Sequence, residues 1–589
     1  MSDFIYKKKP AEPGSFIKEI QTIYQEDKPE VREFHGEWGT LAVSENLYHG
    51  FQPHESEQYI TVVLGGPVLC FQENDFLQDG DQTAGTTAVH ERWLHGRMKW
   101  DEDVSGPFVV FILNKQTSEL TCVTDLMAFI PVYACGEKED LLLATHVDML
   151  AGAAGEQNNV DVASQADFIL HGIVTYPYTA YTNLRQLAPA SVHTSKEKGA
   201  PLQTEEYWLP KEIITDHTLE QTAAESRHSL QNYVDTTVQG LDPVAQFISG
   251  GEDSRVLSAL LPGKIRRDAY IFLDGMNREG EIAKKAAVAY GAEFHVETRN
   301  KTHYLNILPS AADLVGSGSQ FHHVHTFGFH KKCNLNRYAA VYGGLFSDAL
   351  LKGARIKKIR GSTRFPFVPQ IKRRSYSAGA PVSNKAFTKE ILSEITKRRQ
   401  AHLEYVKSLR PESSEEWFEL WPSSMNMNIP NLHGNRRLFR SYEPFMAKDI
   451  VKLSASIPQK WKMNRRLFQK AAKPLLQPTK WLFHGEGKLP YYPWFINVII
   501  QFVIWAAREI KRKTGKTKAH QESWADWLSI MGTEEWQRSI DQYADGINII
   551  AAGLKKKDVH ALFSSGTLTK SHRINLMQVI YHGHKKNNR

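Results

Sequence analysis

The stretch QFISGGEDSRVLSALL (Gln246–Leu261) joins a strand pattern to a helix pattern through two adjacent glycines. Apolar residues lead into the turn Ser249-Gly250-Gly251, and beyond it apolar residues recur at the spacing of a helix. Glycines let backbone N–H groups approach an anion closely, and the N-terminus of the following helix adds the positive end of its dipole. The stretch therefore predicts a strand–turn–helix unit that can bind an anion.

The side chains of this turn indicate which anion it would bind. Ser249 and Ser254 can donate to phosphate oxygens, and Asp253 can ligate a magnesium ion that neutralises a pyrophosphate. No Gly-Lys-Ser/Thr follows, which excludes a Walker loop, and the missing third glycine excludes a dinucleotide fingerprint. We predict a pyrophosphate site at Ser249, Gly250, Gly251, Asp253 and Ser254, with an ordinary glycine turn as the alternative.

The patterns on either side of the turn predict two kinds of fold. Between about residues 33 and 208, short β-branched and aromatic runs alternate with turn residues, which predicts an antiparallel, layered domain. From about Thr218, strand and helix patterns alternate, which predicts a parallel sheet. After about Arg373 the chain is expected to be largely helical.

Composition narrows the class of protein. The 589 residues, 41% hydrophobic and 23% charged, suffice for two or three domains with ordinary cores. A net charge of +7 is too weak for a dedicated nucleic-acid binder and leaves a small anionic substrate open. The four cysteines lack the spacing of a metal knuckle or disulfide framework, and the N-terminus lacks a signal sequence, so we expect a cytoplasmic protein.

One apolar run, WFINVIIQFVIWAA (Trp494–Ala507), is too short to span a bilayer and leads into the basic segment REIKRKTGKTK. We favour a buried C-terminal helix with a solvated basic end. The alternative is peripheral contact with an anionic membrane surface.

The order Ser-Gly-Gly-x-Asp-Ser resembles the PP-loop of the ATP pyrophosphatases, and the long β segment before it resembles the asparagine synthetase family, which includes β-lactam synthetases and lasso-peptide cyclases. Softer similarities follow in the same order along the chain. VTDLMAFIPVYA keeps Asp125, Pro131 and Tyr133 of a family motif, and ATHVDMLAG and TAYTNLRQLAPASVH are similar to the segments that follow it.

The resemblance implies further site residues and two cofactors, ATP and Mg²⁺. Leu273 in YIFLDG would line the adenine side, and VYGGLFSDALLKG, with Gly343 and Asp348, is similar to a second phosphate segment. Asp253 and Asp348 would hold the magnesium, although Asp348 could instead be a turn residue. Lys488 would stabilise the adenylation transition state, with Lys480 or a plain surface lysine as alternatives.

The chain departs from the glutamine-dependent members of the family. Their nucleophile is an N-terminal cysteine, whereas residue 2 is serine here and the first cysteine is Cys70. Thr124 replaces the usual arginine before Asp125, and the glutamine-holding segment has no clear counterpart. We therefore expect a glutaminase-like fold without glutaminase activity, in a chain whose first strand begins tens of residues from the N-terminus.

Two further segments allow a functional interpretation. The histidines of QFHHVHTFGFHKK (His322, His323, His325 and His330) could hold zinc, but a substrate contact or general base is favoured because neither carboxylate nor cysteine accompanies them. The basic segment KGARIKKIRGSTRFPFVPQIKRRS could line the entrance for an acidic substrate or cap the pyrophosphate, or be a solvated loop.

Together these features predict an α/β protein: a glutaminase-like (Ntn-type) β-rich layered domain, then a PP-loop α/β synthetase domain with a helical C-terminal part. The expected divisions are 1–32 (N-terminal extension), 33–210 (degenerate glutaminase-like domain), 218–515 (ATP-pyrophosphatase domain) and 516–589 (helical extension).

The expected function is a ligase that adenylates a carboxylate of a small molecule, sugar acid or peptide and lets ammonia or a substrate amine displace AMP. The alternatives are a glutamine-dependent asparagine synthetase or uronic-acid amidotransferase of surface-polysaccharide synthesis, and a non-catalytic ATP-binding scaffold. We expect no nucleic-acid partner, and a homodimer is left open.

Overall fold

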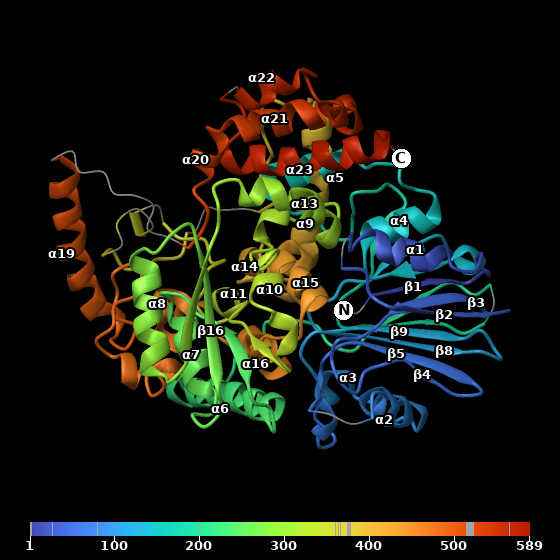
Figure 1. Ribbon diagram of the computed structural model, residues 1–589, viewed down its shortest axis with the longest axis horizontal. Coiled ribbons are helices and arrows are strands. Elements are labelled where there is room, and N and C mark those ends of the chain that lie inside the picture. Colours follow the sequence, from blue (N-terminus) through green and yellow to red (C-terminus); the bar gives the residue numbers. More distant parts are fainter. Residues whose placement is uncertain are drawn as a thin grey trace.

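The computed structural model describes residues 3–588 except 26, 79–80, 198, 360, 363–364, 366, 374–377, 514–522 and 565 (Figure 1). Two antiparallel sheets form the N-terminal part, a parallel sheet occupies the middle of the chain, and helices follow it. These features confirm the predicted α/β class with a β-rich N-terminal domain.

The two N-terminal sheets stack face to face. Their strand orders are β12-β10-β11-β1-β3-β2 and β14-β13-β9-β8-β5-β4, and the strand neighbours run antiparallel. An apolar core that includes Tyr6, Leu41, Val62 and Phe111 fills the space between them. Helices α1 and α4 cover the outer face of the first sheet and α2 that of the second, which gives four layers (Figure 1).

The strands of these sheets have the following bounds: β1 (Phe4–Lys7), β2 (Val31–Gly36), β3 (Gly39–Ser44), β4 (His54–Glu55), β5 (Tyr59–Gly65), β8 (Phe108–Asn114), β9 (Leu120–Thr124), β10 (Tyr133–Cys135), β11 (Leu142–Ala144), β12 (Leu184–Gln186), β13 (Ser191–Ser195) and β14 (Gln203–Glu206). A separate pair is formed by β6 (Val68–Leu69) and β7 (Val104–Ser105).

The expected N-terminal extension is wrong, because β1 lies inside the first sheet. Ile5 pairs with Ala42 of β3 on one side and with Ala144 of β11 on the other. Only the short run Phe4–Tyr6 carries the strand pattern, and three lysines follow it. Lys8 is nevertheless buried, and its Nζ donates to Ser195 Oγ at 2.7 Å, which satisfies the ammonium group there.

The middle of the chain forms the predicted parallel sheet, in the order β17-β16-β15-β18-β19. Its strands are β15 (Val244–Phe247), β16 (Arg267–Leu273), β17 (Glu293–Thr298), β18 (Val341–Tyr342) and β19 (Ser441–Tyr442). From β15 the chain adds β16 and β17 on one side, then β18 and β19 on the other. The carboxyl ends of β15 and β18 therefore flank a topological switch point, where ligands bind in open α/β sheets.

The helices have the following bounds: α1 (Ser15–Thr22), α2 (Ala84–Leu94), α3 (Trp100–Asp103), α4 (Val147–Ala154), α5 (Val162–His171), α6 (Leu219–Val238), α7 (Glu252–Leu260), α8 (Arg278–Ala289), α9 (His303–Val315), α10 (Phe329–Lys332), α11 (Ser347–Leu350), α13 (Lys389–Leu409), α14 (Ser414–Phe418), α15 (Ile429–Leu438), α16 (Lys448–Ser456), α17 (Gln459–Lys462), α18 (Arg466–Ala472), α19 (Trp494–Lys513), α20 (Trp527–Met531), α21 (Glu534–Tyr543), α22 (Val559–Ser564) and α23 (Lys570–Asn587).

The C-terminal helices reach back to the N-terminal part of the chain. Asn575 in α23 donates through Nδ2 to the carbonyl oxygens of Phe168 and Ile169 in α5, at 3.1 and 3.2 Å. The predicted helical C-terminus is present, and it packs against α5 and α9 in a shared core rather than projecting from the body. Within the described residues, none of the helices has both the length and the hydropathy needed to cross a membrane.

The favoured interpretation of the apolar run as a buried helix is wrong. Helix α19 lies at the edge of the molecule, apart from the helical cap formed by α20–α23 (Figure 1). Ile499 and Val503 are 68% and 60% exposed. The helix is apolar on most of its circumference, and here one apolar side is turned outward while Trp505 packs against Phe365 and Phe367.

Candidate functional site

The Ser249–Gly251 turn connects β15 to α7 at the switch point, as the sequence predicts. Its own hydroxyl groups close the turn. Gly251 N donates to Ser249 Oγ at 3.1 Å, and Ser249 N donates to Ser254 Oγ at 3.1 Å. The two hydroxyl oxygens lie 3.3 Å apart, so a ligand would meet them as one polar surface.

A second loop, residues 482–488, lies directly against this turn. Gly485 N donates to the carbonyl oxygen of Gly250 at 3.2 Å, and a Cβ on Gly250 would lie 3.4 Å from Gly485 N. The buried Arg255 donates to the carbonyl oxygens of Leu482 and Phe483 at 2.8 and 2.6 Å. The lack of a side chain at Gly250 therefore lets the backbones of the turn and the loop approach closely. This contact places the loop that carries Lys488 at the candidate site.

Lys488 lies in a chain of ion pairs at this loop. Its Nζ donates to Glu486 Oε2 at 2.5 Å, and Arg465 Nη2 lies 3.6 Å from the same oxygen. Burial lowers the pKa of Lys488, and the charge of Arg465 lowers it further. Lys480, the alternative, directly follows the 3₁₀ turn Gln477–Thr479, and no ion pair joins it to this chain among the described residues.

The two predicted metal ligands meet at a lysine that the sequence analysis did not single out. Lys352 Nζ lies 2.6 Å from Asp253 Oδ2 and 2.6 Å from Asp348 Oδ1. Glu252 Oε1 is 3.5 Å from the same ammonium group and 2.8 Å from Arg465 Nη1. The structure therefore brings Asp253 and Asp348 together, and the cation between them here is Lys352; their role as magnesium ligands stays a prediction.

This cluster separates the pKa values of its carboxyl groups. Burial raises the pKa of Asp253 to about 6, and the charges of Asp348 and Glu252 add to that rise while Lys352 opposes it. Burial also disfavours charge on Asp348, but Lys352 outweighs it and lowers the pKa to about 2. Burial would lower the pKa of Lys352, yet the three carboxylates raise it above its ordinary value.

Besides Glu252 Oε1, which lies in an ion pair with Arg465, two buried polar atoms of the cluster have no hydrogen-bond partner in the described part of the chain. Asp253 Oδ1 and Ser347 Oγ are buried, and nothing in the described structure donates to or accepts from them. A carboxylate oxygen of this kind is the ligand that Mg²⁺ prefers. The donor set therefore fits the magnesium ion that the resemblance implies.

The segment after β18 runs beside Asp253. A Cβ on Gly344 would lie 3.5 Å from Asp253 Cβ, and one on Gly343 would lie 2.2 Å from Glu443 Oε1. Glu443, which the sequence analysis missed, is buried and accepts from Leu345 N at 2.9 Å and Ser441 Oγ at 3.1 Å. Burial raises the pKa of Glu443 to about 7. Gly343 therefore makes room for this carboxyl group.

Leu273 does not present its side chain to the site. It is buried in the core between α8 and the sheet, beside Ile248 and Ala283. Its carbonyl oxygen accepts from Arg299 N at 2.7 Å. Any contact of this residue with a nucleotide would therefore involve backbone atoms at the end of β16.

Three of the four predicted histidines form an aromatic cluster. The ring centroids of His322 and His323 are 4.6 Å apart, and those of His323 and His325 are 5.7 Å apart. Trp524 packs against His325 at 4.7 Å. Burial lowers the pKa of His323 to about 4 and takes those of His322 and His325 well below their ordinary range, so all three are neutral near pH 7. His330 lies apart and faces Asp27.

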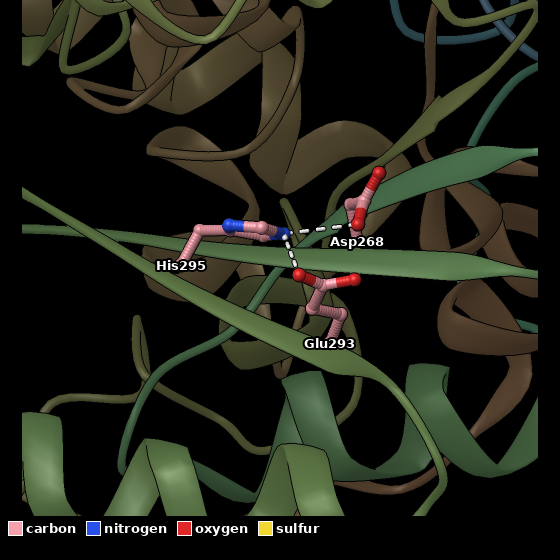
Figure 2. Close-up of side chains that lie close together, drawn as sticks. All are labelled: Asp268, Glu293 and His295. Atoms are coloured by element: carbon pink, nitrogen blue, oxygen red, sulfur yellow. Dashed lines mark hydrogen bonds and ion pairs between the residues drawn. The ribbon is translucent and has the colours of Figure 1, made fainter.

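The group with metal-ligand spacing in the described part of the chain is a different one, Asp268, Glu293 and His295 (Figure 2). His295 Nε2 lies 2.9 Å from Asp268 Oδ1 and 3.9 Å from Glu293 Oε1. Asp268 and Glu293 are register partners near the amino ends of β16 and β17. The group is therefore at the sheet edge opposite Ser249–Gly251, and Tyr338 and Arg337 also contact Asp268.

The basic segment is only partly described. Arg355 Nη1 and Lys357 Nζ both pair with Glu419, at 3.1 Å for Arg355. These two cations are therefore engaged by the protein itself. The remainder of the segment includes residues outside the described ranges.

The N-terminal end of β1 is tied to the second half of the chain. Ser2 lies outside the described residues, and Asp3 is buried. Its carboxylate accepts from Arg437 Nη2 at 2.7 Å, Arg436 Nη2 at 3.0 Å and Tyr24 Oη at 2.7 Å. These charged partners lower the pKa of Asp3 well below its ordinary value although burial opposes them. A buried carboxylate therefore adjoins the position of the family's nucleophile.

Asp125, kept from the family motif, organises a turn. It is buried and accepts from Met127 N and Phe129 N, both at 3.0 Å. Burial raises its pKa to about 7 although these hydrogen bonds oppose the rise. Ser423 and Trp421 of the second half hydrogen-bond to the same turn. Its role in the structure is to shape this contact between the two halves.

Comparison with known proteins supports the resemblance. Residues 38–208 match the family model of the glutamine amidotransferase domain. The chain is 23% identical over 188 residues to asparagine synthetase [glutamine-hydrolyzing] 3 of Bacillus subtilis, covering 31% of this chain and 30% of that protein. The chain thus spans about a third of the length of this curated relative. The two matches confirm the predicted similarity to the asparagine synthetase family, and the family-model match is confined to residues 38–208.

Two solved structures are also similar. One is the allosteric regulatory enzyme of purine biosynthesis, with a TM-score of 0.26 and 10% identity, covering 51% of this chain and 80% of that one. The other is glutamine phosphoribosylpyrophosphate amidotransferase from B. subtilis, with a TM-score of 0.23 and 10% identity, covering 42% of this chain and 61% of that one.

Proposed function

We propose that this chain is an ATP-dependent amide synthetase. In its first step a substrate carboxylate oxygen attacks the α-phosphorus of ATP, which forms an acyl-adenylate and releases pyrophosphate. In the second step an amine attacks the acyl carbon and displaces AMP. The observation that carries the proposal is the meeting of the Ser249–Gly251 turn, the Asp253–Asp348 pair and the Lys488 loop at one switch point.

The turn supplies the pyrophosphate contacts. Backbone N–H groups at Gly250 and Gly251, at the start of α7, suit an anion, and the hydroxyls of Ser249 and Ser254 lie together beside them. Gly343 would complete the site from the neighbouring strand. These groups bind and orient the leaving pyrophosphate without taking part in bond making.

Magnesium would be held by Asp253, through its unpartnered Oδ1, and by Asp348. When bound, it would neutralise the charge of the pyrophosphate. The role of Lys352 is to balance both carboxylates when neither metal nor nucleotide is present, because an uncompensated pair of charges there would be unfavourable.

Lys488 is our choice for the transition-state cation. It is carried by the loop that contacts Gly250, and its side chain is only 25% exposed, so its charge is partly desolvated. A fixed ammonium group in such a place stabilises negative charge that develops at the α-phosphate. Arg465 lies beside it and could share this role.

The amine is proposed to be free ammonia or an amine of the substrate, because residue 2 is serine rather than the cysteine of glutamine-dependent relatives. The main alternative is glutamine-dependent synthesis, either of asparagine or of a uronic-acid amide. The amidotransferase domain match and the glutamine-hydrolysing relative favour this alternative.

The test is pyrophosphate and AMP release from Mg-ATP by the purified full chain, against uronic acids, aspartate and acidic peptides, with ammonium or glutamine added in turn. Release that requires one carboxylate supports the proposal. Glutamate formed from glutamine would favour the glutamine-dependent alternative. ATP binding without AMP formation for any substrate would instead support a scaffold.

A matched pair of variants places the activity at this site. Asp253→Asn should lower release on the order of 100-fold. Asp140→Asn removes an exposed carboxylate that also pairs with a lysine at 2.6 Å, Lys9, and should leave release unchanged. Equal activity of both variants would contradict the assignment of the site.

A further inference from the structure

Helix α19 presents a row of apolar residues to solvent, whereas other large apolar residues of the helix, among them Ile504 and Trp505, are half-buried. Phe495, Ile499, Phe502, Val503 and Ile510 are all exposed. Their spacing of four, three, one and seven residues places them along one side of the helix. A helix on the surface of a globular protein normally shows the opposite arrangement, with its apolar side toward the core.

The face toward the protein makes aromatic and polar contacts. The ring centroid of Phe367 lies 5.3 Å from that of Trp505 and 5.2 Å from that of Phe502, at the border of the exposed row. Asn497 Oδ1 accepts from Leu489 N at 2.7 Å, and Asn497 Nδ2 donates to the carbonyl oxygens of Leu489 and Tyr492 at 3.0 and 2.9 Å. Gln501, one turn further on the same side, is only 4% exposed. The hydrogen bonds of Asn497 and the packing of Trp505 therefore hold the helix in one rotation, which leaves the apolar stripe outward.

The charge along α19 is uneven. Its N-terminal end begins with Trp494 and Phe495, and its last six residues, 508–513, include four cations and one anion. Arg508 is exposed. Aromatic residues beside an apolar stripe, with cations at one end, are the composition of helices that lie in the interface of an anionic bilayer.

We propose that α19 binds the surface of an anionic membrane, with its axis parallel to the bilayer and the stripe Phe495–Ile510 inserted among the lipid headgroups. The helix does not span the bilayer, because none of the described helices meets the requirement for crossing. A second copy of the chain is less well matched to α19, because an identical helix carries the same excess of cations and offers no excess of anions to neutralise it. An anionic lipid surface complements both the apolar stripe and the charge.

The docked helix would hold the candidate site near the bilayer. Leu489 directly follows Lys488, and Ile504 of α19 would lie 3.0 Å from a Cβ placed on Gly487. The loop that contacts the Ser249–Gly251 turn is therefore attached to the proposed membrane helix. The membrane proposal stands on the helix alone and does not depend on the chemistry of the site.

Vesicle co-sedimentation of the full chain tests the proposal. We expect the protein to sediment with vesicles of phosphatidylcholine and phosphatidylglycerol in equal parts, to bind pure phosphatidylcholine weakly, and to lose affinity as salt is added. The double variant Ile499→Asp/Val503→Asp should weaken binding by at least about ten-fold, because it places two charges in the stripe.

The matched control is Leu528→Asp on α20, which adds a charge at a 71% exposed apolar residue outside the stripe and should bind as the wild type does. Because all three positions are exposed, the variants should fold, and circular dichroism checks this. Undiminished binding of the double variant overturns the proposal. The proposal is also overturned if the wild type does not bind vesicles but sediments without them as a dimer, and the double variant disrupts that dimer. The stripe would then be an interface between two copies of the chain.

Discussion

The Nζ atom of Lys352 lies 2.6 Å from Oδ2 of Asp253, although the two residues are 99 positions apart in the chain. The contact exists because β15 and β18 are neighbours in the parallel sheet, so that the helices following them begin side by side. Asp348, one turn before Lys352, completes the contact. A buried lysine therefore occupies the position between two carboxylates at which a metal is expected.

Replacing Lys352 by methionine should destabilise the protein by about 3 kcal/mol, because the substitution leaves the carboxylates of Glu252 and Asp253, whose side chains are 3% and 21% exposed, without this cation. Chemical denaturation of the wild type and the variant measures the change. Adding Asp253→Asn to Lys352→Met should recover part of the loss, since it removes one of the repelling charges. A Lys352→Met variant as stable as the wild type would show that the cluster is solvated rather than ion-paired.

Pyrophosphate release should require both acidic ligands. We expect Asp253→Asn and Asp348→Asn each to lower it on the order of 100-fold.

Pyrophosphate release by the wild type should also rise as the pH passes about 6. Burial raises the pKa of Asp253 to about 6, and this carboxyl group must lose its proton to bind a metal. Initial rates between pH 5 and pH 8, at magnesium well below saturation, measure this, because saturating metal would displace the proton. A flat profile would contradict a metal role for Asp253.

Much of the site's frame could be predicted from the sequence. The Gly-Gly turn and the alternating patterns around it specified β15, α7, β16, α8 and β17, because strand and helix periodicities are local properties. The pairing of Asp253 with Asp348 followed from the resemblance. Neither conclusion required knowledge of which distant segments meet.

Residues that depend on tertiary contacts could not be predicted in the same way. Lys352 becomes informative only once strand order places β18 beside β15, and Arg465 reaches Glu252 from a segment more than 200 residues away. The outward face of α19 also depended on a tertiary contact. Its hydropathy pattern suits burial and exposure equally, and the hydrogen bonds between Asn497 and Leu489 and the packing of Trp505 decide between them.

Lys488→Met should lower the turnover number for pyrophosphate release on the order of 100-fold and change the KM for ATP little, because the ammonium group is proposed to act on charge that develops in the transition state. Lys480→Met is the matched control, eight residues earlier in the same segment, and should behave as the wild type does. If Lys480→Met showed the loss and Lys488→Met did not, the role would pass to Lys480. A rise in KM alone would assign Lys488 to ground-state binding.

Glu443 should make the folded protein less stable as the pH rises. Burial raises its pKa from 4.5 to about 7 in the folded state, so between these values the folded state binds more protons than the unfolded state. Stability from this group is therefore complete below pH 4.5 and lost as the pH rises through 7, by up to about 3 kcal/mol.

The variant Glu443→Gln tests this, because it keeps a neutral side chain of the same shape at every pH. The difference in unfolding free energy between the variant and the wild type should shift in favour of the variant from pH 5 to pH 8. Asp125, whose pKa is raised in the same direction, is present in both proteins and cancels in that difference. A difference that does not change with pH would mean that Glu443 is already charged in the folded protein, and Gly343 would then lie beside a buried anion.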